Sequence, residues 1–396
     1  MLISDRFHVS YCTNIHPGEN WEVTFAHLKA NVPKVKQRIA PDTDFGLGLR
    51  LSNRASEELE QGTHLQEFKQ WLLDEGCYVY TMNGFPYGNF HNERVKDKVH
   101  QPDWTTMSRV HYTQRLFEQL AHVLPKGLDG SISTSPISYK HWFETPEAKE
   151  AAMRTGADHM LELAVQLYRT EQASGRYLNL AIEPEPDGIL ENSAEVIAFF
   201  KDYLVPQGQE RFGKEYGFDP EKAAYLVKRY ITVCYDVCHF SLAYEAPERT
   251  FKAFKEQGIN IGKIQVSSAL KIRLDGDVDG IWKALSAFDE PTYLHQVTEK
   301  RDGKVVTYAD LTEVLGKSDT GKELRAHFHV PIFLEDFGML GATQDQILET
   351  LDCLKDSDIC DHLEVETYTW DVLPDGLKFD LVDSIVRELD WLIKKL

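Results

Sequence analysis

An aspartate and a histidine lie three residues apart at the end of an apolar, β-branched segment. The stretch is "ITVCYDVCHF", residues 231–240, and it contains Asp236 and His239. One interpretation is structural: the aspartate ends a strand and caps the next helix, and the histidine is partly buried. The other is chemical, because a carboxylate and an imidazole at a strand end can bind a metal ion or a substrate. This stretch alone does not distinguish the two.

Polar residues stand at comparable positions in three other strand-like segments. The four residues are Glu183 in "YLNLAIE" (177–183), Asp236 in "ITVCYDV" (231–237), Gln265 in "GKIQVSS" (262–268) and Glu366 in "HLEVETY" (362–368). Side chains alternate along a strand, and each of these residues falls on the row opposite the bulky apolar side chains. In a barrel, the apolar row would pack against outer helices and the polar row would face the axis. The pattern therefore predicts that the four side chains converge.

Three converging carboxylates need a positive partner, because burying unpaired charges costs several kcal/mol each. A divalent cation would supply it. Oxygen ligands from carboxylates and an amide favour Mn²⁺ or Mg²⁺, with Zn²⁺ or Co²⁺ as alternatives. The competing interpretation is a polar core layer in which Arg50 and Lys263 are the counterions. We favour the metal site, with Glu183, Asp236, Gln265 and Glu366 as its ligands.

The elements that would position these residues are strand-like runs separated by amphipathic helical stretches. Eight such runs occur, at 7–12, 45–52, 77–82, 130–135, 177–183, 231–237, 262–268 and 362–368. Strands alternating with helices predict a parallel sheet, and eight such units most often close into a (β/α)8 TIM barrel. A doubly wound open sheet is the alternative, but no GxGxxG motif follows the first strand.

Two connections are longer than a barrel requires, and we expect them to be insertions after strands five and seven. The first lies in 184–230, and the second, larger one begins at residue 269. Its 269–340 portion includes a predicted β-hairpin around Arg301-Asp302-Gly303-Lys304. Insertions after barrel strands lie at the C-terminal face, where barrel active sites are found. Without a repeat or a low-complexity linker, we expect residues 1–396 to form one domain.

Composition excludes several classes of partner. The chain of 396 residues has 43 Lys and Arg against 63 Asp and Glu, a net charge of −20. Such a surface repels phosphate backbones, so we expect no nucleic acid. We also expect no membrane insertion, because no apolar run is long enough. The absence of a signal-like N-terminus and six scattered cysteines predict a cytoplasmic protein with free thiols.

The four strand ends resemble those of the xylose-isomerase-like TIM barrels, a group of sugar isomerases and epimerases that includes hydroxypyruvate isomerase. The matching segments are "AIEPEP", "YDVCH", "KIQVSS" and "EVETY". The resemblance implies a metal held by Glu183, Asp236, Gln265 and Glu366, with Gln265 similar to the hydroxypyruvate-isomerase branch. It also implies that His239 contacts the substrate.

A narrower resemblance covers nearly the whole chain. The segments "YCTNIHPGE", "TMNGFPYGNFH", "GSISTSPISYK" and "YDVCHFS" are similar to the EboE family of metabolite-traffic proteins. This likeness implies a role in moving or maturing a small metabolite, together with a protein partner in that pathway. It does not specify a reaction.

Four further residues are candidates for substrate binding. They are His16 in "NIHPGE", Arg50 on the inward row of its strand, Asn83 in "TMNGFPYG" and His329 in "AHFHVPIF". His16 could equally be a loop histidine beside a Pro-Gly turn, and Asn83 could belong to a plain aromatic turn. His329 is preferred to His327 because "HVPI" resembles the His-x-Pro-x pattern of the isomerases.

The first functional hypothesis is an isomerase or epimerase acting on a small polyhydroxy carbonyl compound. The metal would stabilise an enediolate, and Glu183 and Glu366 would move the proton while His239 binds a substrate oxygen. The second hypothesis is a non-catalytic carrier that holds a metabolite on the same barrel. A nuclease resembling endonuclease IV is a third, and the charge of −20 argues against it.

Overall fold

A parallel β-barrel forms the centre of the protein. The structure is a computed structural model that describes all residues except 89–95, 290–294, 318–319, 356, 370–372 and 374–379. The parallel strands among the described residues are β2 (Phe7–Tyr11), β3 (Phe45–Arg50), β4 (Cys77–Asn83), β5 (Gly130–Thr134), β6 (Leu178–Ile182), β7 (Ile231–Asp236), β8 (Ile261–Val266) and β15 (His362–Val365). Each coincides with one of the eight predicted runs. The prediction of a (β/α)8 TIM barrel is therefore confirmed.

The sheet curls so that its two ends meet. The order is β1-β2-β15-β8-β7-β6-β5-β4-β3, in which the short β1 (Leu2–Ile3) pairs antiparallel with β2. Strands β2 and β3 close the barrel, and the ladder between them is reduced to an isolated parallel bridge, Cys12 to Gly48. Just above this bridge, the Arg50 backbone N–H donates to Thr13 Oγ1 at 2.9 Å.

Contacts between strands that are not neighbours identify the row that faces the barrel axis. The Tyr80 hydroxyl on β4 donates to the Leu363 carbonyl on β15 at 2.8 Å. Ser131 Oγ on β5 lies 3.2 Å from His362 Nδ1 on β15. Because these strands do not pair with each other, the side chains must meet inside the barrel. The polar rows of β5 and β15 thus face inward, as the alternation predicts.

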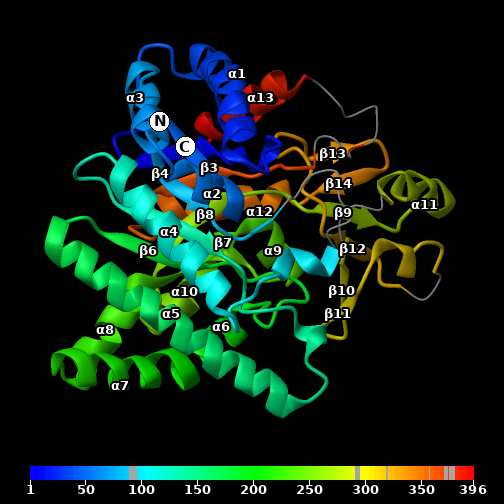
Figure 1. Ribbon diagram of the computed structural model, residues 1–396. Coiled ribbons are helices and arrows are strands. Elements are labelled where there is room, and N and C mark those ends of the chain that lie inside the picture. The colour runs from blue at the N-terminus through cyan, green and yellow to red at the C-terminus, as the bar shows by residue number, and fades with distance from the viewer. Residues whose placement is uncertain (89–95, 290–294, 318–319, 356, 370–372, 374–379) are drawn as a thin grey trace.

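Helices surround the barrel (Figure 1). They are α1 (Trp21–Ile39), α2 (Asn53–Leu59), α3 (His64–Asp74), α4 (Met107–Val123), α5 (Pro146–Ser174), α6 (Ser193–Phe199), α7 (Val205–Tyr216), α8 (Pro220–Tyr230), α9 (Val237–Leu242), α10 (Pro247–Glu256), α12 (Gln344–Lys355) and α13 (Leu381–Ile393). The extra segment after the fifth barrel strand contains α7, which packs against α5 and α8. None of the described helices is long and apolar enough to cross a membrane.

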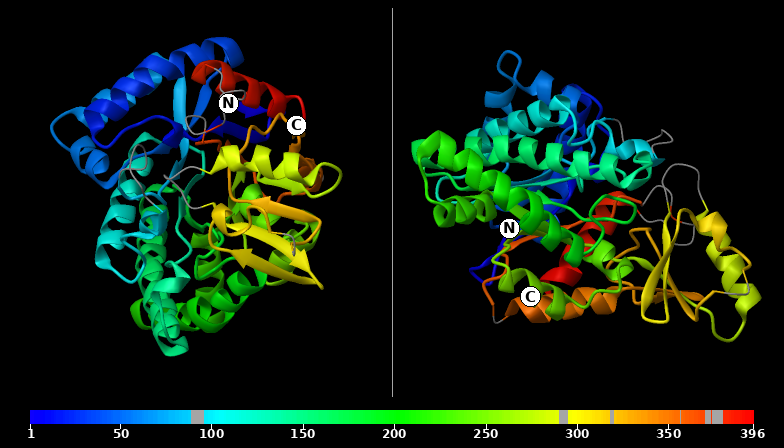
Figure 2. Two further views of the ribbon diagram at one scale, coloured as in Figure 1. Left: turned by 90° about the vertical axis from the view of Figure 1, so that its right-hand side faces the viewer. Right: turned by 90° about the horizontal axis from the view of Figure 1, so that it is seen from below.

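A second sheet follows β8 and lies beside the barrel, away from the helices α7 and α8 (Figure 2). Its strands, in the order β11-β10-β12-β9-β14-β13, are β11 (Lys304–Tyr308), β10 (Val297–Arg301), β12 (Glu323–Ala326), β9 (Leu270–Arg273), β14 (Leu340–Ala342) and β13 (Asp336–Phe337). Strands β10 and β11 form a hairpin closed by Asp302 and Gly303, both with positive φ, as a type I′ turn requires. Helix α11 (Val278–Leu285) accompanies this sheet.

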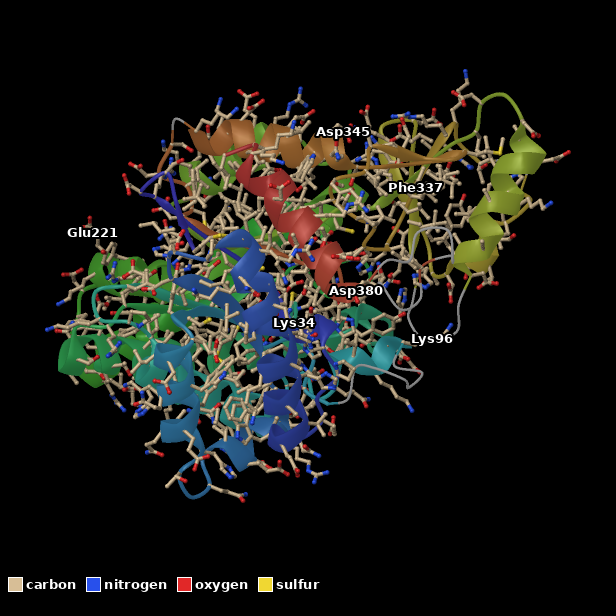
Figure 3. The ribbon with its side chains drawn as sticks, turned by 90° about the horizontal axis from the view of Figure 1, so that it is seen from above. Lys34, Lys96, Glu221, Phe337, Asp345 and Asp380 are labelled. Carbon is tan, nitrogen blue, oxygen red and sulfur yellow. The ribbon has the colours of Figure 1, made fainter. Side chains whose placement is uncertain are left out.

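The second sheet lies at the end of the barrel where the parallel strands finish. In Figure 3, Phe337 on this sheet and Lys96 lie toward one end of the molecule, and Glu221 on α8 lies at the opposite end. Lys96 Nζ contacts Asp310 Oδ2 at 2.8 Å, which links the segment after β4 to the segment after β11. The second sheet thus helps to build the mouth above the C-terminal ends of the strands.

Candidate functional site

Three carboxylates meet at the C-terminal ends of the barrel strands. Ligand oxygens of Glu183, Asp236 and Glu366 all lie within 4.8 Å of one another, and all three side chains are buried. They come from the ends of β6, β7 and β15, so the structure brings together the three carboxylates that the sequence placed on the inward row.

Asp236 caps helix α9 with one carboxylate oxygen, and its second oxygen takes no part in the cap. Its Oδ1 accepts the His239 backbone N–H at 3.0 Å, at the start of α9, and the Ser267 hydroxyl at 2.8 Å. Its Oδ2 is buried and has no hydrogen-bond partner in the part of the chain that the structure describes. The structural interpretation of the Asp-x-x-His stretch is therefore correct for one oxygen, and the second oxygen remains available to a cation.

Glu366 is held by two asparagine amides. Asn14 Nδ2 and Asn83 Nδ2 each donate to Glu366 Oε1 at 2.8 Å. Two donors to one oxygen favour the ionised carboxylate and fix its orientation. Glu183 differs, because its Oε2 is buried with no hydrogen-bond partner among the described atoms. The site thus contains one fixed carboxylate and one that lacks donors.

Gln265 lies directly beside Asp236 in the sheet register and is fully buried. Its Oε1 accepts the Cys234 thiol at 2.8 Å, and its Nε2 has no partner within the described residues. Turning the amide over would place the oxygen where Nε2 now lies. The position therefore fits an amide ligand at the edge of the three carboxylates.

Lys263 and Arg50, the counterions in the interpretation as a polar core layer, contact groups other than the three carboxylates. Lys263 Nζ pairs with Glu364 Oε2 at 2.5 Å, inside the barrel. The Arg50 guanidinium donates to backbone carbonyls of Gly18, Pro86 and Gly88. Across the described residues, no Lys or Arg forms an ion pair with Glu183, Asp236 or Glu366; their ion-pair partners are His239 and His329, at 3.8–3.9 Å.

Burial dominates the protonation of this cluster. Burial raises the pKa of Glu183 well above its ordinary value, and the neighbouring Asp236 charge raises it further. Burial also raises the pKa of Glu366, with Glu183 as the second cause. A cation that binds here would displace protons, because its ligands must be ionised.

A pocket with a cavity volume of about 70 Å³ opens above the carboxylates. Among the predicted residues, Glu183, Glu366, Asn83, His239 and His329 line it. Asp236 and Gln265 lie buried below, with no exposed side-chain surface. The remaining lining residues are Asn14, Phe85, Pro86, Lys96, Val99, His100, Glu185, Gln296, His327 and Tyr368.

Two of the predicted substrate-binding residues do not line this pocket. The His16 ring contacts the Tyr11 hydroxyl through Nε2 at 2.9 Å and stacks on His27. Arg50 instead ties together the segments that follow β2 and β4. Both side chains are buried.

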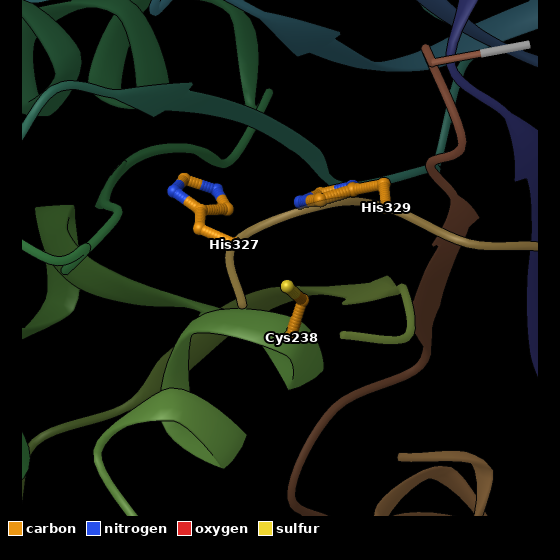
Figure 4. A group of neighbouring side chains, drawn as sticks. All are labelled: Cys238, His327 and His329. Carbon is orange, nitrogen blue, oxygen red and sulfur yellow. The ribbon is translucent and has the colours of Figure 1, made fainter. Parts of the chain in front are cut away.

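Three histidine rings form one wall of the pocket. His239 belongs to α9, and His327 and His329 belong to the segment after β12. In Figure 4 the His329 ring points toward His327, and the Cys238 thiol points toward both rings. Burial lowers the pKa of His239 and of His327 well below the ordinary value and also lowers that of His329. Burial thus favours the neutral form of these three imidazoles.

Several pocket residues were not singled out from the sequence. Glu185 was within the quoted "AIEPEP", and the alternation of the Glu-Pro pairs was a usable signal. His100 Nε2 lies 3.1 Å from Glu185 Oε1, and burial lowers the pKa of His100 to about 3. Asn14 and Gln296 carried no signal, because a single amide in a loop is a common residue.

Solved structures share the fold. A xylose isomerase-like TIM barrel protein from Mycobacterium smegmatis, in complex with magnesium, matches with a TM-score of 0.51 and 11% identity over 100% of this chain and 98% of that chain. The IolI protein with a binding zinc atom matches with 0.48 and 12% over 98% and 97%, and a D-tagatose 3-epimerase-like protein with 0.47 and 8% over 98% and 96%. No protein-family model and no curated protein matches the sequence. The magnesium-bound structure from Mycobacterium smegmatis and this chain thus share the TIM-barrel fold.

Proposed function

We propose that the protein is a metal-dependent isomerase or epimerase that acts on a small polyhydroxy carbonyl compound. The observation that carries the proposal is the cluster of Glu183, Asp236 and Glu366, whose ligand oxygens lie within 4.8 Å at the floor of a pocket. Asp236 Oδ2 lacks a partner among the described atoms, as expected for an oxygen whose partner is a cation. With Gln265, the donor set is all oxygen and suits Mn²⁺ or Mg²⁺.

The cation would supply positive charge next to the substrate oxygens on which negative charge develops. The protein's own residues divide the remaining work. Glu183 is the base, because its Oε2 receives no hydrogen bond from the described residues and burial raises its pKa well above the ordinary value. Glu366 is the fixed carboxylate, since two amides orient it. His329 donates Nδ1–H to the Glu366 carbonyl at 2.8 Å and presents Nε2 to the pocket.

The size and polarity of the pocket support a small, hydroxyl-rich ligand. Most of the lining residues carry a carboxylate, an imidazole or an amide, and Phe85, Pro86, Val99 and Tyr368 add apolar surface. Such a lining offers many hydrogen bonds to a small ligand rich in hydroxyl groups. The carrier hypothesis is therefore the second candidate, and likeness to the EboE family and a protein partner in metabolite traffic remain part of the proposal.

Proton exchange with solvent tests the proposal without knowledge of the substrate. A panel of ketoses, aldoses and α-hydroxy-keto acids would be incubated in D₂O with the Mn²⁺-loaded protein and followed by NMR. We expect deuterium at the carbon next to the carbonyl for at least one compound. Glu183→Gln should abolish the exchange while the far-ultraviolet circular dichroism is unchanged. Exchange that persists in this variant would remove Glu183 as the base.

A second readout separates an enzyme from a carrier. Ligand binding to the same panel would be measured by isothermal titration calorimetry with wild type and with the matched control Glu162→Gln, an α5 residue outside the pocket. If a compound binds but no compound exchanges deuterium, the carrier hypothesis would replace the isomerase hypothesis. Neither binding nor exchange across the panel would contradict the substrate class.

A further inference from the structure

A second cavity lies beside the pocket of the proposed active site. It has a volume of about 300 Å³ and is lined by Pro186, Glu191, Asn192, His239, Leu242, Ala243, Glu245, Thr298, Val305 and Thr307. His239 lines both spaces, and Gln296 Nε2 in the first donates to the Pro186 carbonyl of the second at 3.3 Å. This ring and this hydrogen bond therefore separate the two. The volume is at the lower end of the range for small-molecule sites, roughly 300–1,000 Å³.

One side of the second cavity is a face of the β10–β11 hairpin. Thr298 and Thr307 lie opposite each other in the register of the two strands, and Val305 shares the face of Thr307. All three line the cavity. Thr298 is 3% exposed, and its Oγ1 is buried with no hydrogen-bond partner among the described residues. Because an unpaired buried hydroxyl costs free energy, a polar group of a bound ligand would supply the partner that it lacks.

Two carboxylates, Glu191 and Glu245, give the second cavity its charge. Glu191 Oε1 pairs with Lys140 Nζ at 2.7 Å. Glu245 accepts only neutral donors among the described residues, namely the backbone N–H of Ser193 at 3.0 Å and its hydroxyl at 2.7 Å. The described lining contains no Lys or Arg. The cavity thus has an excess of negative charge, which favours a ligand with a positive group.

Arg325 is the cation that the sheet register places beside Thr298. Its Nε pairs with Glu323 Oε1 at 3.0 Å, and its Nη1 donates to the Ser241 carbonyl at 2.7 Å. The guanidinium is not part of the described lining. Its charge is therefore balanced by Glu323, and the excess of negative charge remains at Glu245.

The remaining lining suits a short carbon chain. Its apolar members are Pro186, Leu242, Ala243 and Val305. A metal ion is a poorer fit than an organic cation, because Glu191 and Glu245 do not belong to any described group of three ligands close enough to hold one. We propose that the second cavity binds a small aliphatic amino alcohol, with the ammonium group at Glu245 and the hydroxyl at Thr298.

Calorimetric titration of the full chain at pH 7 tests the charge at Glu245. The compounds are aminopentanol, with the ammonium and the hydroxyl at opposite ends, and pentanediol, in which a hydroxyl replaces the ammonium. We expect aminopentanol to bind about tenfold tighter than pentanediol. Glu245→Gln keeps an acceptor for Ser193 and should lower the affinity for aminopentanol to that for pentanediol. Glu248→Gln, at an exposed position outside the cavity, is the matched control and should bind as wild type does.

A second variant tests the hydroxyl of Thr298. Thr298→Val keeps the branched shape that suits a strand and removes only the oxygen. We expect aminopentanol to bind roughly fivefold more weakly to this variant than to wild type. Pentylamine, which has no hydroxyl, should bind equally to both. A distorted cavity would weaken both compounds alike, so an equal loss for the two, or no loss for aminopentanol, would overturn the role of Thr298.

The carboxylate site of Glu183, Asp236 and Glu366 could also attract an amine, so the location is tested separately. Glu183→Gln should bind aminopentanol as wild type does. Affinity that is lost in Glu183→Gln and kept in Glu245→Gln would place the amine in the first pocket and overturn the inference. Absence of binding, or equal affinity for aminopentanol and pentanediol, would also overturn it.

These measurements do not depend on the proposed function. Binding is measured without turnover, so a failure to find deuterium exchange leaves the second cavity as it stands. Should Glu245→Gln not fold, Glu191→Gln is the second variant, because it removes the other carboxylate of the lining. It should likewise lower the affinity for aminopentanol and leave that for pentanediol unchanged, and an unchanged affinity for aminopentanol would count against the proposal.

Discussion

Lys263 on β8 and Glu364 on β15 form an ion pair inside the barrel, one layer below the carboxylate site. The Nζ–Oε2 distance is 2.5 Å, and neither side chain has more than 1% exposed surface. The pKa of Lys263 is raised, with burial opposing the shift and the charge of Glu364 as its largest favourable cause. Each of these two buried charges is therefore balanced by the other, within the interior of the barrel.

Removing one partner of this pair should be costly. Lys263→Met leaves the Glu364 carboxylate buried without a cation, and we expect a loss of about 3–5 kcal/mol in the free energy of unfolding. The double variant Lys263→Met/Glu364→Gln removes both charges and should recover a large part of that loss. Urea unfolding at pH 7 measures both values. A double variant no more stable than the single one would contradict the pairing.

Gly48 provides the space that Glu364 occupies. A Cβ at Gly48 would lie 1.6 Å from Glu364 Oε1, across the barrel from β3 to β15. Gly48→Ala should therefore destabilise the protein by about 1–3 kcal/mol, as overpacking does. Gly213→Ala is the control, because its Cβ would meet its nearest neighbour at 3.6 Å in a helix, where alanine is favoured. Equal unfolding midpoints for the two variants would exclude the steric role of Gly48.

Asn83 should influence metal binding without being a ligand. Its amide fixes Glu366 Oε1, and loss of such a partner lowers metal affinity by roughly 10–100-fold. Calorimetric titration of Asn83→Ala with Mn²⁺ should show this drop in affinity at unchanged stoichiometry. Asn260→Ala, at an exposed position, serves as the control. Unaltered Mn²⁺ affinity in Asn83→Ala would mean that Glu366 does not need its amide donors.

His362 should make the fold sensitive to acid. Burial lowers its pKa from 6.5 to about 3 in the folded protein. The folded form therefore disfavours the proton that the unfolded chain takes up below pH 6.5, and stability is lost as the pH falls from 6.5 toward 3. His362→Gln removes this group, and between pH 7.5 and 5 the variant should lose about 2 kcal/mol less stability than wild type.

The measurement is urea unfolding at the two pH values. The exposed His111→Gln variant should follow wild type. Identical pH dependence in wild type and His362→Gln would show that the buried ring does not govern the acid limb.

The barrel could be predicted from the sequence because its strands are strongly patterned. Bulky residues such as Leu178 and Leu180 alternate with small or polar ones, and both rows are buried for different reasons. The same alternation placed Glu183 and Asp236 on one inward row. Helix α7 was harder to recognise, since the segment 206–222 is polar and rich in glycine.

The second sheet and the asparagine partners of Glu366 could not be predicted from the sequence, for physical reasons. Strands β13 and β14 have two and three residues, too short for a period to appear. Asn14 and Asn83 meet on Glu366 only because β2, β4 and β15 are curled into one barrel. His239 Nδ1 lies 3.0 Å from the Pro184 carbonyl, whose position no pattern of side chains specifies.

Strands β2 and β3 are joined only by the isolated bridge between Cys12 and Gly48 among the described residues. We call this weakly paired boundary between β2 and β3 the seam of the barrel. Along this seam few backbone amides are protected by a partner strand, whereas the β3–β4 and β7–β8 ladders run over several residues. Amide hydrogens at the seam are therefore the first of the barrel to exchange with deuterated solvent. Closure of the seam brings Asn83, at the end of β4 on one side, to Glu366, which follows β15 on the other side. A cation that holds Glu366 in place would therefore also slow the opening of the barrel.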